Sequence, residues 1–150
     1  MELTWTLTGT GWADLTWRHG SDTLELGTSY LGDALPDLLD AALDLQLGSS
    51  ATFTHLLGEP GGHRVFFSGA AEMVFVQIVM FPDLSAARNW WAGGKPLWSA
   101  RVRTAEVIAA ILAMGEQARA AYPPQDYQQR WGRAFPEAKL GLLRERISAA

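Results

Sequence analysis

Residues 63–81 read HRVFFSGAAEMVFVQIVMF, and the second half of this stretch decides the fold. From Met73 to Phe81 both alternation faces are apolar, with Gln77 as the one polar interruption. A strand that is wet on one side would alternate apolar with polar residues. We therefore expect residues 73–81 to form a central strand, paired on both sides and covered on both faces.

The segments before this strand also have the patterns of strands. Residues 65–68 precede it across Gly69-Ala70-Ala71, a connection short enough for an antiparallel hairpin. Residues 2–30 alternate apolar with polar positions, interrupted by two glycine-containing turns. This pattern predicts a three-stranded meander with one wet face.

Residues 33–47 have the clearest helical pattern in the chain. Leucine and alanine recur on one side at about 100° per residue. Asp33 is suited to cap the start of this helix, and Gly48 is suited to end it. The opposite side carries an acidic stripe with no basic residue on the helix: Asp33, Asp37, Asp40 and Asp44.

The remaining segments complete an α+β pattern. We expect a strand at 52–57, an irregular stretch at 82–96, a strand at 97–103, a second long helix at 105–122 and short C-terminal helices. The predicted fold is α+β: one mostly antiparallel sheet of about six or seven strands, with the two long helices packed on it. No linker or repeat interrupts residues 1–150, which we interpret as one domain.

Composition excludes several classes of protein. The chain has 150 residues, is 48% hydrophobic and contains no cysteine, so disulfides and thiolate chemistry are absent. No segment approaches the roughly 20 apolar residues of a membrane span. The first residues have a strand pattern and lack the regions of a signal peptide. We expect a soluble cytoplasmic protein that does not bind membranes.

The net charge of −4 conceals an asymmetry along the chain. Residues 1–60 carry nine acidic residues and one basic residue, a net charge of −8, whereas residues 61–150 carry +4. Such asymmetry influences association with partners rather than the fold. Because nucleic-acid binding needs a clearly basic surface, the small excess in residues 61–150 disfavours that class.

Motifs for catalysis or metal binding are missing from the sequence. The three histidines show no metal-ligand spacing, and no P-loop, GxGxxG, HExxH or GxSxG pattern occurs. His55 and His63 could face each other across the Glu59-Pro60 turn, but two polar residues on a half-exposed sheet explain them more simply. We expect no catalytic residues and no metal or organic cofactor.

The acidic stripe is the most specific feature of the sequence. Acidic helix faces are often merely solvated, but like charges at i,i+4 cost about 0.2–0.5 kcal/mol per pair, and aspartate is a poor helix former. Nothing in the chain's own folding calls for the arrangement. We predict that Asp37, Asp40 and Asp44 face solvent and meet a basic partner.

A second candidate surface lies in the irregular stretch, at Asn89, Trp90 and Trp91. Tryptophan beside arginine and asparagine is typical of interface hot spots. Adjacent aromatic residues in an extended chain point in opposite directions, so one of the two can be buried while the other is exposed. Burial of both tryptophans at the open end of the sheet is an equally good interpretation.

Four passages carry a resemblance to a known class of protein: GTGWADLTW (9–17), SYLGDALPDLLDAALDLQLG (29–48), LGEPGGHRVFF (57–67) and YPPQDYQQRWGRAFPEAKLGLLRER (122–146). The layout resembles that of small bacterial immunity proteins of contact-dependent and polymorphic toxin systems, many of which are single α+β domains with acidic faces. The resemblance implies that the protein binds and blocks a cognate toxin inside the producing cell. It is one of layout, so no functional residue is transferred.

The predicted function is a non-catalytic protein-binding module, immunity-like, with a protein partner such as a basic toxin domain. The alternative is a small-ligand-binding domain with an aromatic-lined pocket between sheet and helix. An enclosed apolar cavity of several hundred Å³ favours the alternative, and a filled core favours the binding module.

Overall fold

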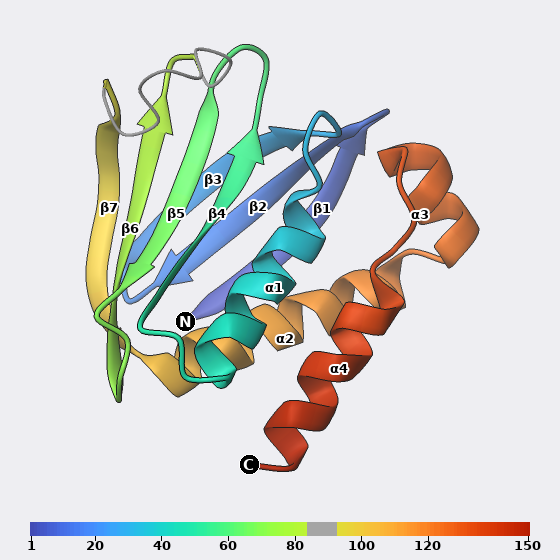
Figure 1. The fold of residues 1–150 in the computed structure, drawn as a ribbon. Coiled ribbons are helices and arrows are strands. Elements are labelled where there is room, and N and C mark those ends of the chain that lie inside the picture. Colours follow the sequence, from blue (N-terminus) through green and yellow to red (C-terminus); the bar gives the residue numbers. More distant parts are fainter. Residues whose placement is uncertain (84–92) are drawn as a thin grey trace.

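The computed structural model of the protein describes residues 1–83 and 93–150. Within these ranges the elements follow in the order β1 (Glu2–Gly9), β2 (Trp12–His19), β3 (Asp22–Ser29), α1 (Ala34–Gln46), β4 (Ala51–Leu57), β5 (Gly62–Ser68), β6 (Met73–Phe81), β7 (Lys95–Arg103), α2 (Thr104–Ala121), α3 (Pro124–Trp131) and α4 (Glu137–Ser148) (Figure 1). The predicted α+β class is confirmed.

The strands form two antiparallel sheets, β1-β2-β3 and β4-β5-β6-β7, so the prediction of a single sheet is wrong. The sheets meet where β3 approaches β4. There the Thr28 hydroxyl donates a hydrogen bond to the Leu57 carbonyl oxygen at 3.2 Å, in place of a backbone ladder. The alternation of apolar and polar residues predicts each strand, but it does not predict which strands pair with each other.

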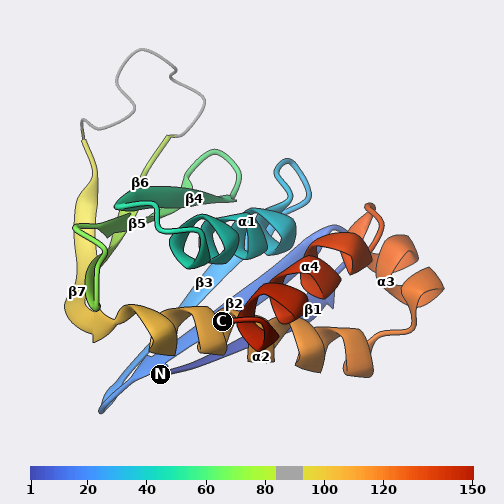
Figure 2. The same ribbon diagram turned by 60° about the horizontal axis from the view of Figure 1, so that its bottom comes forward.

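Strand β6 is paired with β5 on one side and β7 on the other, as its pattern predicts. On one of its faces Val74, Val76 and Ile78 are fully buried. On the other face Phe75 and Gln77 are half-buried. The expected cover on both faces is therefore only partial on this second face, because α1 and the first sheet lie on the opposite side of the β4–β7 sheet (Figure 2).

The meander has the single wet face that its alternation predicts. Leu3, Trp5 and Leu7 of β1 are buried, while the residues between them are partly or fully exposed. Helix α2 packs along β1, and α4 crosses in front of α1 and α2 (Figure 2). In residues 1–83 and 93–150, no helix has the length and apolar character to cross a membrane.

Candidate functional site

Helix α1 is almost enclosed by the rest of the fold. Nine of its residues are buried, and its neighbours are β4, α2 and α4 (Figure 2). Steps of four and three residues return to the same side of a helix with 3.6 residues per turn. The acidic stripe therefore occupies the side of α1 that the core does not use, and the predicted helix is confirmed.

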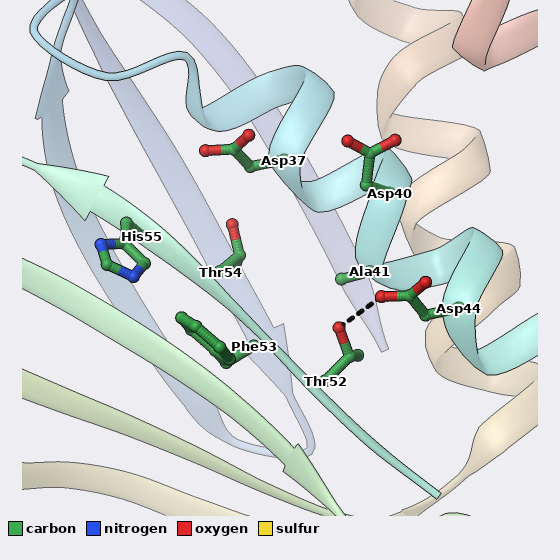
Figure 3. A pocket seen from close by; sticks show the side chains of 8 residues that line it. All are labelled: Asp37, Asp40, Ala41, Asp44, Thr52, Phe53, Thr54 and His55. Atoms are coloured by element: carbon green, nitrogen blue, oxygen red, sulfur yellow. Dashed lines mark hydrogen bonds between the residues drawn. The ribbon is translucent and has the colours of Figure 1, made fainter. Parts of the chain in front are cut away.

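The acidic stripe forms one wall of an open groove of about 270 Å³. Asp37, Asp40 and Asp44 line it from α1, and residues 52–55 of β4 line the opposite side (Figure 3). The structure thus brings the three predicted carboxylates together with an edge strand of the β4–β7 sheet.

Two of these carboxylates have partners within the fold, so the expectation that folding makes no use of the stripe is wrong. The Thr52 hydroxyl donates a hydrogen bond to Asp44 Oδ2 at 2.7 Å (Figure 3). The Lys139 ammonium of α4 forms an ion pair with Asp40. Both partners come from other elements, where the pattern of α1 alone could not reveal them.

Asp37 differs from its neighbours, because its carboxylate has no hydrogen bond or ion pair with any described residue. Burial raises the pKa of Asp37 above its ordinary 3.8, and the negative charges of Asp33 and Asp40 act in the same direction. Lys139 and Arg133 partly oppose these effects. Asp37 is thus a half-buried anion whose charge the fold does not fully compensate.

Thr54 lies beside Asp37 in the same groove. The side chain is 1% exposed, and its hydroxyl has no hydrogen-bond partner in the part of the chain that the structure describes. Figure 3 shows the hydroxyl directed from β4 toward α1. A buried polar group without a partner costs about 1–3 kcal/mol, so Thr54 is a second group in this groove with an unused hydrogen-bonding capacity.

His55 completes the β4 wall of the groove. Burial lowers the pKa of this imidazole below 6.5, and the nearby Arg64 guanidinium lowers it further. The ring is therefore neutral at neutral pH, and it does not repel a cation. Sequence reasoning missed Thr52 and Thr54, because only the packing of α1 over β4 shows that these two threonines face the groove.

We expect Asp37→Asn to raise the free energy of unfolding at neutral pH. The folded protein holds the Asp37 proton more tightly than the unfolded chain, so this carboxylate lowers stability as the pH rises through its ordinary pKa of 3.8 and then through its raised folded value. Asparagine lacks the charge, and the gain should vanish below pH 3.8. Thermal unfolding of both proteins across this range measures the difference.

Asp126→Asn provides the matched control, because Asp126 is an exposed acid of α3 outside the groove. This variant makes the same change in net charge and should leave stability nearly unchanged. An Asp37→Asn protein that is no more stable than wild type at neutral pH would contradict the raised pKa of Asp37.

The groove offers hydrogen-bond acceptors and negative charge. Among the described residues, no group of three or more histidine, aspartate or glutamate side chains is placed to hold a metal ion. The carboxylates lie along the helix instead of converging on a point, and the chemistry they support is the recognition of cationic or hydrogen-bond-donating groups.

A second hollow of about 300 Å³ lies near the start of α1. Its lining includes Tyr30, Trp131 and the glycines of two turns, so it has the aromatic character of the alternative function. It lies between the β1–β2 turn and the end of α3, not between sheet and helix. Because it is open, it does not form the enclosed apolar cavity that a small apolar ligand requires.

The predicted surface at Asn89, Trp90 and Trp91 lies outside the described residues. The other tryptophans belong to the core or to sheet faces: Trp5, Trp17 and Trp131 are buried, Trp98 is half-buried and Trp12 is exposed. The groove beside α1 is therefore the candidate site that the structure describes in full.

Comparison of the chain with models of protein families, with curated proteins and with solved structures finds no match. The function is therefore inferred from the geometry and charge of the groove.

Proposed function

We propose that this protein is a non-catalytic binding module of the immunity type, which binds a basic toxin domain and blocks it. The observation that supports the proposal best is the groove beside α1. Asp37, Asp40 and Asp44 line one wall of a concave surface, on a helix whose other sides are buried.

The energetics of the stripe favour a binding role over solvation. Asp33/Asp37 and Asp40/Asp44 are like-charge pairs at i,i+4, which destabilise a helix. Lys139 compensates Asp40, yet Asp37 remains half-buried with a raised pKa. A cationic surface brought against the groove would relieve this cost on binding, and complementary charge also accelerates encounter.

A photo-cross-linking residue at position 44 tests the proposal in the native host. Asp44 is exposed at the rim of the groove, so the substitution does not disturb the core. We expect illumination to link one protein with a basic surface to this position. The same residue at position 126 of α3 serves as the control and should not link that protein. A cross-link that forms equally from both positions would contradict a specific groove.

A growth assay with the captured protein then distinguishes inhibition of a toxin from binding alone. The proposal expects that its expression slows the growth of a naive bacterium and that co-expression of the present chain restores growth. A partner that is harmless to the cell would contradict the immunity role.

Replacing the three groove acids by asparagine should slow association with this partner about tenfold at low ionic strength, and less at high salt. The reason is that surface charges act mainly on the rate of encounter. Stopped-flow or surface-based kinetics measure the rate. The matched control carries Glu25→Gln, Asp126→Asn and Glu145→Gln, three exposed acids outside the groove with the same total change in charge. Equal rates for both triple variants would show that the groove has no special part in the encounter.

A further inference from the structure

Two polar groups without partners in the described part of the chain lie at the Asp37 end of the groove. The Asp37 carboxylate has no partner among the described residues, and the Thr54 hydroxyl across from it is buried and likewise without a partner there. Figure 3 shows both groups directed toward the space between α1 and β4. An anion and an unused hydroxyl facing the same space form a complementary surface for a group that is cationic and donates several hydrogen bonds.

We propose that Asp37 and Thr54 form a subsite for one arginine side chain of the protein partner. The inference rests on the proposed function, because the side chain belongs to the protein that the groove binds. Asp37 supplies the carboxylate that accepts N–H groups of the guanidinium, and the Thr54 hydroxyl accepts a further one.

The neighbouring carboxylates explain why the subsite lies at Asp37. Asp40 already pairs with Lys139, which shows that this face of α1 accommodates a cation. The Asp44 carboxylate accepts a hydrogen bond from the Thr52 hydroxyl. The guanidinium of Arg133 acts on Asp37 only through space, because its Nε and Nη2 both donate to the Tyr30 carbonyl oxygen.

The shape of the groove favours arginine over lysine. A guanidinium is a flat fork with five donors, whereas an ammonium is a compact, strongly hydrated point charge. Acceptors approach from two sides, α1 and β4, which suits the fork.

Titration of the full chain with N-acetyl-arginine amide tests the subsite without the partner. We expect millimolar binding that shifts the NMR signals of the Thr54 amide and the Asp37 carboxyl, and that lowers the pKa of Asp37. N-acetyl-citrulline amide, a neutral analogue of the same shape, should cause no such shifts, and N-acetyl-lysine amide should bind more weakly. Equal shifts from arginine and citrulline would overturn the inference.

Two variants locate the site. Asp37→Asn should weaken arginine binding at least fivefold, and so should Thr54→Val, which keeps the shape of the side chain and removes the hydroxyl. Asp126→Asn should bind arginine as wild type does. Undiminished binding by both groove variants, each shown to be folded by its NMR spectrum, would overturn the assignment to Asp37 and Thr54.

The outcomes separate this inference from the proposed function. If arginine fails to bind while the cross-link at position 44 and the rescue of growth are observed, the subsite is wrong and the proposed function stands. If arginine binds but no protein cross-links from position 44, the site for a guanidinium stands and the proposed function is wrong.

Discussion

Trp131→Ala is expected to lower the free energy of unfolding by about 3–5 kcal/mol, the usual cost of truncating a fully buried tryptophan. Trp131 is 0% exposed and contacts Trp5 edge to face, with 5.3 Å between ring centroids. Its indole N–H also donates to Asp33 Oδ1 at 3.0 Å. The substitution therefore removes packing between α3 and β1 and a bond that holds the start of α1. Urea unfolding measures the loss.

Trp131→Phe separates the two contributions. Phenylalanine keeps an aromatic ring in the core but cannot donate to Asp33, so the loss should be smaller than for alanine and should include the removed hydrogen bond. A loss below about 1 kcal/mol for Trp131→Ala would contradict the packing that the structure shows.

Phe67→Ala should be nearly as damaging, with an expected loss of about 3–5 kcal/mol. Phe67 is 1% exposed on the inner face of β5, between Thr52 of β4 and Val76 of β6. Its removal leaves a cavity on the inner face of the β4–β7 sheet. Thermal or urea unfolding measures the change.

Phe75→Ala is the matched control for this prediction, because Phe75 lies on the neighbouring strand β6 with its side chain on the opposite face. It is half-buried, so less apolar surface returns to water and the loss should be clearly smaller. Equal losses for the two variants would contradict the smaller burial that the structure gives Phe75.

Local patterns in the sequence predicted the features that depend on neighbouring residues. The spacing of leucines and aspartates placed α1 and its acidic side, and the apolar run at 73–81 placed a strand with partners on both sides. The number of sheets could not be predicted, because alternation is the same whether β3 and β4 share a ladder or are joined only through Thr28 and Leu57.

The candidate site shows the same limit. Asp33 was predicted to cap the start of α1, and it occupies that position. Its carboxylate, however, accepts a hydrogen bond from the indole N–H of Trp131, which lies 98 positions later in the chain. The partners of Asp40 and Asp44 are likewise on other elements. Thr54 escaped prediction because a threonine in an alternating strand resembles a solvent-facing residue, and only the packing of α1 over β4 buries it.

The enclosure of α1 determines how rigidly the backbone holds the groove carboxylates. A helix held by nine buried side chains cannot rotate or shift without disturbing the core. In the proposed complex the acidic wall should therefore keep its backbone geometry, and little conformational entropy should be lost in ordering it. If the proposed binding function is correct, this surface presents a rigid template and any conformational adaptation falls to the partner protein.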